Sequence, residues 1–304
     1  NRNHLHLWDA ATGQHVRELL AGSHPITRLA WSPNGKHILI SREGKSVAAA
    51  DLFMLNLDDK PPTPYLEDSN PATLMAFSGD GALFASAHRN APKAADESIA
   101  VWDTGSRERL WTLTIAGAGI TRLKFDGQHR RLLSITDNDE TFVWDMETGK
   151  QTAGFKSDTA VINAEFSADG AHLLLVCENS VRVMDLASKA VVATLRADQL
   201  LLKLARFSRD GKFIVTAGQD RSVRLWDVAT GLQAGCFGEP GLDPSSLELS
   251  ENGTRLMVAH SDGIGRVWDM PLLPAVLPPW WPSFLECMAG RGFTTTGAME
   301  VLTQ

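Results

Sequence analysis

The residue types in this chain that could do chemistry are its nine histidines and three cysteines, because imidazole and thiolate are common metal ligands and nucleophiles or bases. His4 and His6 alternate along one short segment, but no HExxH motif or compact Cys/His cluster occurs, which argues against a metal site. Cys177, Cys236 and Cys287 are odd in number and lack CxxC spacing. This argues against a disulfide framework and favours a reducing compartment.

Motifs for nucleophilic or nucleotide chemistry are also missing from the sequence. No serine lies in a Gly-x-Ser-x-Gly motif, and the Gly-Ile-Gly at 263–265 stops short of GxGxxG and follows a turn. We therefore expect no catalytic, metal-binding or cofactor-binding residues and no cofactor. Because a catalytic triad assembles across a fold, an enzyme or a small-ligand-binding protein stays the alternative hypothesis.

The composition narrows the class of protein further. The chain has 304 residues, 43% of them hydrophobic and 21% charged, which is enough apolar material for a sizeable core. The formal net charge of −7 lacks the concentrated basic surface that binds phosphate backbones, so we expect no nucleic-acid partner. No apolar run is long enough to span a membrane, and we expect a cytoplasmic protein without a membrane partner.

An internal repeat organises the chain. The dipeptide Trp-Asp begins at positions 8, 102, 144, 226 and 268, and Leu55 and Met184 hold the same place in between. The steps between these seven anchors are 47, 47, 42, 40, 42 and 42 residues. A period of about 40–45 residues is typical of a four-stranded propeller blade.

A second ladder of turn motifs runs in phase with the first. It consists of WSPNGK at 31–36, FSGDGA at 77–82, FSADGA at 166–171, FSRDGK at 207–212 and LSENGT at 249–254, with FDGQHR at 125–130 as a degenerate copy. Asp-Gly or a close variant between two apolar runs predicts a hairpin, because glycine tolerates a positive φ. Each repeat therefore predicts four strands: one before the turn, one after it, one that ends at the Trp-Asp, and one that follows the Trp-Asp.

These residues resemble the WD40 family over about 1–270, and the resemblance implies an all-β fold, a β-propeller of four-stranded antiparallel blades. Strands a and b flank the Asp-Gly turn, c ends at the anchor, and d is outermost. We expect a seven-bladed ring whose first blade is incomplete, since 1–20 supply only strands c and d, with the missing strands upstream of Asn1.

The chain after the repeats, residues 271–304, predicts a proline-rich tail with one short helix at about 283–289. Together with the repeats it resembles bacterial multi-repeat WD40 proteins, which are often fused to a serine/threonine kinase. A kinase or another domain in the same parent chain is therefore an expected companion.

The resemblance also implies which turns matter. An acid six residues before the anchor ties the b–c turn in the family, and here Asp96, Asp220 and Asp262 hold that place. Partners of propellers meet the d–a and b–c loops, where long insertions such as 87–98 lie. The candidate partner-binding residues are His24, His88, Arg89, Lys93, Asp137, Asp139, Glu140, Gln219, Arg221 and His260.

A final pattern comes from the residue that precedes the aromatic position of each innermost strand. In the last four copies it is Lys124, Glu165, Arg206 and Glu248, which alternate in charge. Adjacent inner strands would let these residues pair in sequence around a channel, or they are unrelated solvated charges. The aromatic residues themselves, Trp31 among them, are expected to pack between blades.

The sequence thus predicts a protein-interaction scaffold or a sensor and regulatory module that presents a rigid propeller face to a protein or peptide. The partner's identity does not follow from the fold.

Overall fold

The computed structural model is built of β-strands, and no helix occurs in the part of the chain that it describes. That part comprises residues 4–21, 25–42, 52–58, 64–68, 72–89, 97–127, 130–178, 180–196, 202–237, 243–250, 254–269, 291–293 and 299–301. The chain divides into two compact units, Asn1–Lys156 and Ser157–Gln304. The described residues contain no membrane-spanning helix.

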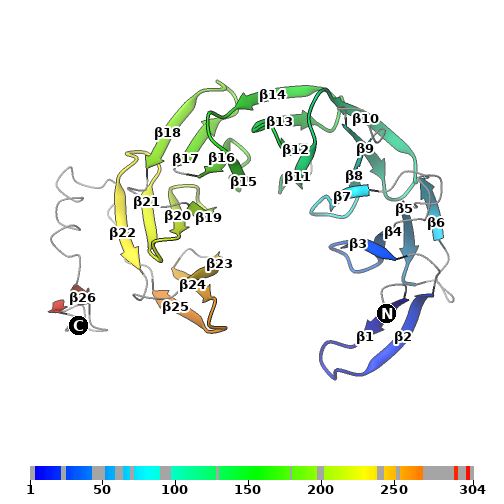
Figure 1. Ribbon diagram of the computed structural model, residues 1–304, viewed down its shortest axis with the longest axis horizontal. Helices are drawn as coiled ribbons and strands as arrows, with labels where there is room; N and C mark the ends of the chain where they lie inside the picture. The colour runs from blue at the N-terminus through cyan, green and yellow to red at the C-terminus, as the bar shows by residue number, and fades with distance from the viewer. Residues whose placement is uncertain are drawn as a thin grey trace. The chain divides into compact units, whose positions relative to one another are not determined.

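The first unit holds one two-stranded and three four-stranded antiparallel sheets, each made of consecutive strands (Figure 1). The two-stranded sheet is β1 (His4–Trp8) and β2 (His15–Ala21). The others are β3 (Ile26–Trp31), β4 (His37–Arg42), β5 (Leu52–Asn56) and β6 (Pro64–Asp68); β7 (Ala72–Phe77), β8 (Leu83–Arg89), β9 (Glu97–Asp103) and β10 (Arg109–Ile115); and β11 (Ile120–Phe125), β12 (Arg131–Thr136), β13 (Glu140–Asp145) and β14 (Gln151–Lys156).

The second unit repeats this plan with two four-stranded sheets, a three-stranded sheet and a short ladder near its C-terminal end. Its strands are β15 (Val161–Phe166), β16 (His172–Cys177), β17 (Ser180–Asp185) and β18 (Val191–Arg196); β19 (Leu202–Phe207), β20 (Phe213–Gly218), β21 (Val223–Asp227) and β22 (Gln233–Phe237); β23 (Pro244–Leu249), β24 (Arg255–His260) and β25 (Gly265–Asp269); and β26 (Arg291–Phe293) and β27 (Met299–Val301).

The hairpin between the first two strands of a sheet is built by the serine of the turn motif. The hydroxyl of Ser167 accepts a hydrogen bond from the backbone N–H of His172 at 2.9 Å and donates one to Asp169 at 2.6 Å, while Gly170 adopts a φ of +67°. In the degenerate copy the buried carboxylate of Asp126 replaces the hydroxyl and accepts from the backbone N–H of Arg131 at 3.3 Å. The degenerate motif therefore still closes the same hairpin.

Successive sheets pack through aliphatic side chains within each unit. In the first unit, the first strands of neighbouring sheets contact one another, β3 with β7 and β7 with β11. In the second, β15 contacts β19 and β19 contacts β23. Buried side chains from adjacent sheets form shared cores, for example Leu113 and Ile115 of β10 with Leu132 and Trp144. This is the sheet-on-sheet packing of propeller blades, and it confirms the predicted fold class.

The anchors end strand c as predicted, but their burial differs. Trp102, Trp144, Met184 and Trp226 are buried, whereas Trp268 is only half-buried because β25 is the last strand of its described sheet. Trp31, expected to pack between blades, is 52% exposed. Its strand β3 packs against β7 on one side, and the sheet that precedes it has only two strands.

Other expectations about the ends of the chain have mixed outcomes. Residues 4–21 form two strands without inner partners among the described residues, as predicted. The tail helix expected at about 283–289 falls outside the described residues. The β26–β27 ladder in the tail was not predicted.

Candidate functional site

Three tryptophan anchors are fixed by a hydroxyl on the neighbouring strand, two residue pairs further along the register. The Nε1–H···O distances are 3.2 Å for Trp102–Ser86, 2.9 Å for Trp144–Ser134 and 2.8 Å for Trp226–Thr216. All six side chains are buried, so each bond satisfies an indole N–H that would otherwise cost free energy in the core. The tryptophans are thus structural.

The hydroxyl disappears where the anchor is not tryptophan. Ile40 in the sheet of Leu55 and Leu175 in the sheet of Met184 hold the equivalent position, and Val258 holds it in the sheet of Trp268. Since neither Leu nor Met has an N–H to satisfy, an aliphatic partner removes a polar group from the core. This coupled substitution was missed from sequence, although a Ser or Thr ten residues before Trp144 and Trp226 is a readable signal.

The acids of the b–c turns accept the hydrogen bonds that hold these turns. Asp220 accepts from the backbone N–H of Ser222 at 3.1 Å and pairs with Arg224 at 2.7 Å. Asp262 accepts from the backbone N–H of Ile264 at 2.9 Å, and this bond is the main cause that lowers the pKa of its carboxyl. Asp96 falls outside the described residues.

The turn between β12 and β13 carries the exposed Asp137 and is braced from two sides. The carboxylate of Asp137 accepts from the backbone N–H of Gly119 at 3.0 Å, and its own N–H donates to the carbonyl of Gly119 at 2.8 Å. From the neighbouring sheet, the buried Glu97 accepts from the backbone N–H of Ile120 at 2.7 Å. The d–a loop and the b–c turn of this sheet are therefore joined at one edge.

The rest of this turn is held by its own side chains. The hydroxyl of Thr136 donates to Asn138 at 2.5 Å and accepts from the backbone N–H of Glu140 at 3.1 Å, and Asp139 adopts a φ of +66°. Lys156 lies 3.4 Å from the Glu140 carboxylate. The turn thus presents acidic side chains from a fixed backbone. The bracing role of Glu97 was not foreseen.

Two residues expected in partner-binding loops lie elsewhere. His88 and His260 are the equivalent residues near the ends of β8 and β24, and each is 3% exposed, so neither presents its ring to a partner in the described structure. His88 bonds the Ser86 hydroxyl at 2.6 Å, and His260 lies edge-on to Trp268. The loop placement of these two histidines was wrong because the strands run further than their hydrophobic pattern indicated.

Of the other residues expected in partner-binding loops, some are exposed and some fall outside the described residues. Gln219 and Arg221 are exposed in the β20–β21 turn, where Arg221 adopts a φ of +64°. His24, Lys93 and the side chain of Arg89 fall outside what the structure describes.

One pair of the expected charge ring is present in the second unit. The guanidinium of Arg206 lies 2.7 Å from Glu165, which also accepts from the backbone N–H of Phe207 at 3.4 Å. Glu248 is exposed and forms no ion pair with Arg206 among the residues described, because that guanidinium is directed to Glu165 on the other side. Lys124 belongs to the first unit, and its position relative to Glu165 is not described. Of the predicted pairs, Glu165–Arg206 is therefore present, and the prediction of an Arg206–Glu248 pair is wrong among the described residues.

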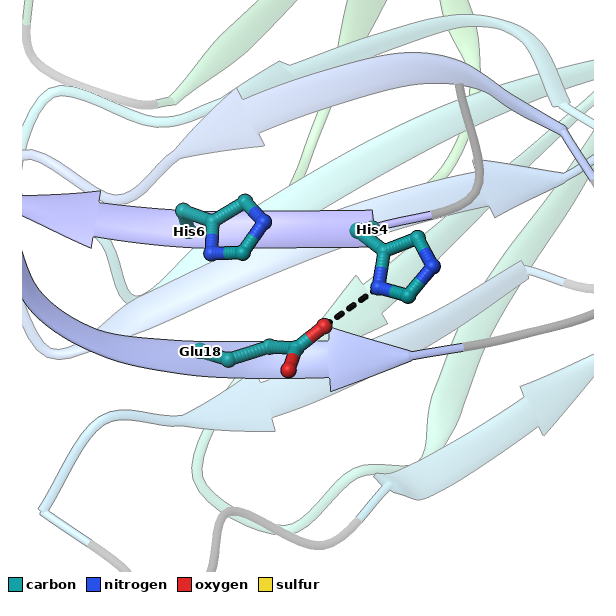
Figure 2. Close-up of side chains that lie close together, drawn as sticks. All are labelled: His4, His6 and Glu18. Atoms are coloured by element: carbon teal, nitrogen blue, oxygen red, sulfur yellow. Dashed lines mark hydrogen bonds and ion pairs between the residues drawn. The ribbon is translucent and has the colours of Figure 1, made fainter. Parts of the chain in front are cut away.

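The two-stranded sheet gathers three imidazoles and a carboxylate that sequence reasoning left apart. His4 and His6 project from β1 towards Glu18 of β2, and His4 Nδ1 is bonded to a Glu18 oxygen (Figure 2). That bond is the main cause that lowers the pKa of Glu18. His6 Nδ1 lies 3.2 Å from His15 Nε2. No local motif signals this cluster, because its members come together through the pairing of two strands.

With this geometry in hand, residues 191–227 match the family described as "WD domain, G-beta repeat". The chain is similar to the C-terminal WD40 domain of Sif2 in its solved structure, with a TM-score of 0.65, 20% identity, and coverage of 89% of this chain and 76% of that one. The repeated four-stranded antiparallel sheets and this likeness define a WD40-type propeller fold.

Curated relatives share the repeat at low identity. Actin-interacting protein 1 of Drosophila melanogaster is 25% identical over 80% of this chain and 40% of its own length. The guanine nucleotide-binding protein subunit beta of Solanum tuberosum is 30% identical over 48% of this chain and 42% of its own. Autophagy-related protein 16 of Arabidopsis thaliana is 23% identical over 57% and 35%. The chain spans less than half the length of each of these relatives.

Proposed function

We propose that the chain is a protein-interaction scaffold, or a sensor and regulatory module, that presents braced d–a and b–c loops to a protein or peptide. The observation that carries this proposal is the β12–β13 turn. Its backbone is fixed by Asp137, Thr136 and Asn138, while the side chain of Asp137 is exposed and those of Asp139 and Glu140 are half-buried. A preorganised loop loses little conformational entropy on binding, so its contacts are converted into affinity. The names of the relatives include an actin-interacting protein, which agrees with a binding role.

The chemistry of this turn defines the partner segment that it would bind. Asp137, Asp139 and Glu140 place three carboxylates in one five-residue turn, where Lys156 pairs with Glu140. Complementary charge favours orientation and association rate. The segment that meets this turn is therefore basic, with Lys or Arg side chains.

An enzyme or a small-ligand-binding protein is the alternative. Its mark would be titratable groups that converge and perturb one another's pKa. Among the described carboxyls with a lowered pKa, Asp9, Asp145 and Asp185 each owe the shift first to a Thr or Ser hydroxyl three residues ahead in the same turn. These three shifts belong to the turns that build the fold and give the alternative no support, whereas the lowered pKa of Glu18, caused first by its bond to His4, belongs to the histidine cluster of the β1–β2 sheet.

The setting of the module is part of the same proposal. We take it to act in the cytoplasm as part of a bacterial multi-repeat protein, with a kinase or another domain in the same parent chain. Neither nucleic acid nor a membrane is among its proposed partners, in keeping with a net charge of −7.

A displayed peptide library selected on the whole chain tests the proposal. We expect selected peptides to be rich in Lys and Arg, and their affinity to fall about tenfold or more when Asp139→Asn and Glu140→Gln are combined, because two desolvated charge pairs are lost. Asn tolerates the positive φ at 139, so the turn keeps its shape.

The matched control is Glu147→Gln, an exposed acid in the β13–β14 turn at the opposite edge of the same sheet. It removes an equal type of charge and should leave peptide affinity unchanged. Selection of no peptide, or an equal loss of affinity in the control, would refute the proposed surface.

A further inference from the structure

The β1–β2 sheet has one apolar and one polar face. Strand alternation places Leu5 and Leu7 against the core that contains the buried Leu19, and turns His4 and His6 to the other side. The pairing is His6 opposite Glu18, with register shifts between Leu5 and His6 and again between Leu7 and Trp8. These bulges bring Glu18 and His15 to the histidine face while Leu19 stays in the core.

Three of the side chains on this face, His4, His6 and Glu18, are close enough to share a ligand. One ligand atom from each of His4, His6 and Glu18 lies within 4.8 Å of the other two. Ligand atoms around a tetrahedral ion with bonds of about 2.0–2.1 Å are about 3.4 Å apart. To reach this spacing the three side chains have to rotate. They are exposed or half-buried, so little packing opposes the rotation. Figure 2 shows the three groups directed towards the same space from two adjacent strands.

Among the described residues, Arg17 is the cation next to Glu18 in sequence, and its guanidinium donates to the carbonyl oxygen of Leu57 in the next sheet, on the core side. The imidazole rings of His4 and His6 are stacked, with centroids 6.1 Å apart and an angle of 9° between their planes. Two parallel rings beside an ionised carboxylate are a ligand set suited to a divalent ion of borderline softness.

We propose that His4, His6 and Glu18 form a binding site for one Zn²⁺ ion, or a chemically similar divalent transition-metal ion, with the fourth coordination position open to water. His15 is a positioning residue, since its bond to His6 Nδ1 leaves the Nε2 atom of His6 as the ligand. The metal links β1 to β2 across the smallest sheet of the first unit. Nothing in this site depends on the proposed interaction surface.

The test uses the full chain without a histidine tag, stripped with a chelator and titrated with Zn²⁺ against a chromophoric competitor. We expect one ion per chain. His4→Ala, His6→Ala and Glu18→Gln should each weaken Zn²⁺ binding at least about tenfold, since each removes a ligand. The control His172→Ala removes a half-buried histidine of β16 outside the site and should leave the affinity unchanged.

Cobalt substitution reports geometry separately from affinity. The Co²⁺ form should show the intense visible bands of a four-coordinate site, and Glu18→Gln should abolish them. His15→Ala should shift these bands, and His15→Gln, which keeps a hydrogen-bonding group, should restore them in part. Circular dichroism of the metal-stripped variants checks that they fold.

Two outcomes would overturn the site. One is the absence of saturable Zn²⁺ binding by the whole chain. The other is equal affinity in the His4, His6, Glu18 and His172 variants, which would place the ion elsewhere.

Discussion

The turns after Trp8 and after Trp144 have the same local structure but different surroundings. In each, the aspartate after the tryptophan accepts from two backbone N–H groups and a threonine hydroxyl, at 3.1, 2.7 and 2.7 Å for Asp9 and 3.1, 2.8 and 2.7 Å for Asp145. In each, a glycine four residues on has a φ of +67°. Yet Trp8 is 59% exposed and Trp144 is 7% exposed.

The difference separates what a repeat makes alone from what it needs its neighbours to make. The turn closes on side chains within four residues, so it forms in a two-stranded sheet as well as in a four-stranded one. Burial of the tryptophan requires strand β12, which supplies Ser134, and the preceding sheet, which supplies Leu113 and Ile115. The Trp-Asp motif therefore predicts the turn more securely than the core.

The largest expected contrast is the loss of each tryptophan. Trp144→Ala should lower the free energy of unfolding by about 3–5 kcal/mol, because it opens a cavity and leaves Ser134 without its indole partner. Trp8→Ala should cost under about 1 kcal/mol, since most of that ring already meets solvent. Urea unfolding followed by circular dichroism measures both. Equal costs would mean that Trp8 is covered in solution.

A smaller contrast comes from the two glycines. Gly13→Ala meets no atom within 4 Å, so it should cost only the strain of a positive φ, about 1–2 kcal/mol. Gly149→Ala carries the same strain and places its Cβ 2.5 Å from the ring of Trp111, whose N–H bonds the carbonyl of Met146 at 3.1 Å. We expect a further loss of about 1–3 kcal/mol.

The control for that contrast is the double variant of Gly149→Ala with Trp111→Ala. Its cost should be smaller than the sum of the two single costs, because the clash needs both side chains. Urea unfolding of the four proteins measures the coupling. Strict additivity would show that the ring of Trp111 does not cover Gly149.

The smallest expected effect is one that the two turns share. The threonine hydroxyl is the largest cause that lowers the pKa of Asp9 and Asp145 below 3.8. A carboxyl whose pKa is lower in the folded chain adds stability that is present above about pH 4 and is lost as the pH falls through the folded pKa. Thr12→Val and Thr148→Val should each raise the pKa of the adjacent aspartate and weaken this acid dependence.

Carboxyl ¹³C NMR titration reads both values directly. Asp169 provides an internal control, because its pKa is lowered first by Ser167 in another turn and should not move. A rise at Asp145 without one at Asp9 would contradict the local equivalence of the two turns.

The strand order of the fold was predictable because turn motifs and anchors act over a few residues. The order a, b, c, d follows from FSADGA at 166–171 and the anchor Met184 alone. Exposure of Trp31 and half-burial of Trp268 were not predictable, since these depend on which sheets adjoin. Burial is a property of the neighbouring sheet as much as of the residue.

The candidate sites divide along the same line. Asp220 and Asp262 could be assigned from their spacing to the anchor, because the bonds that they accept come from residues two positions ahead. Glu97 could not, because the N–H that it meets belongs to Ile120 in the next sheet. The cluster of His4, His6 and Glu18 could not be assigned either, because it depends on two register shifts between β1 and β2 that no residue type predicts.

The stretch that matches the WD domain family, residues 191–227, does not coincide with a sheet of the structure. It takes β18, the outer strand of one sheet, together with β19, β20 and β21 of the next. The unit that evolution duplicates is thus offset by one strand from the unit that packs. A deletion or transplant of residues 191–227 would therefore remove the outer strand of the preceding sheet. A variant that exchanges one whole sheet has to be cut at the borders of the sheet, not at those of the repeat.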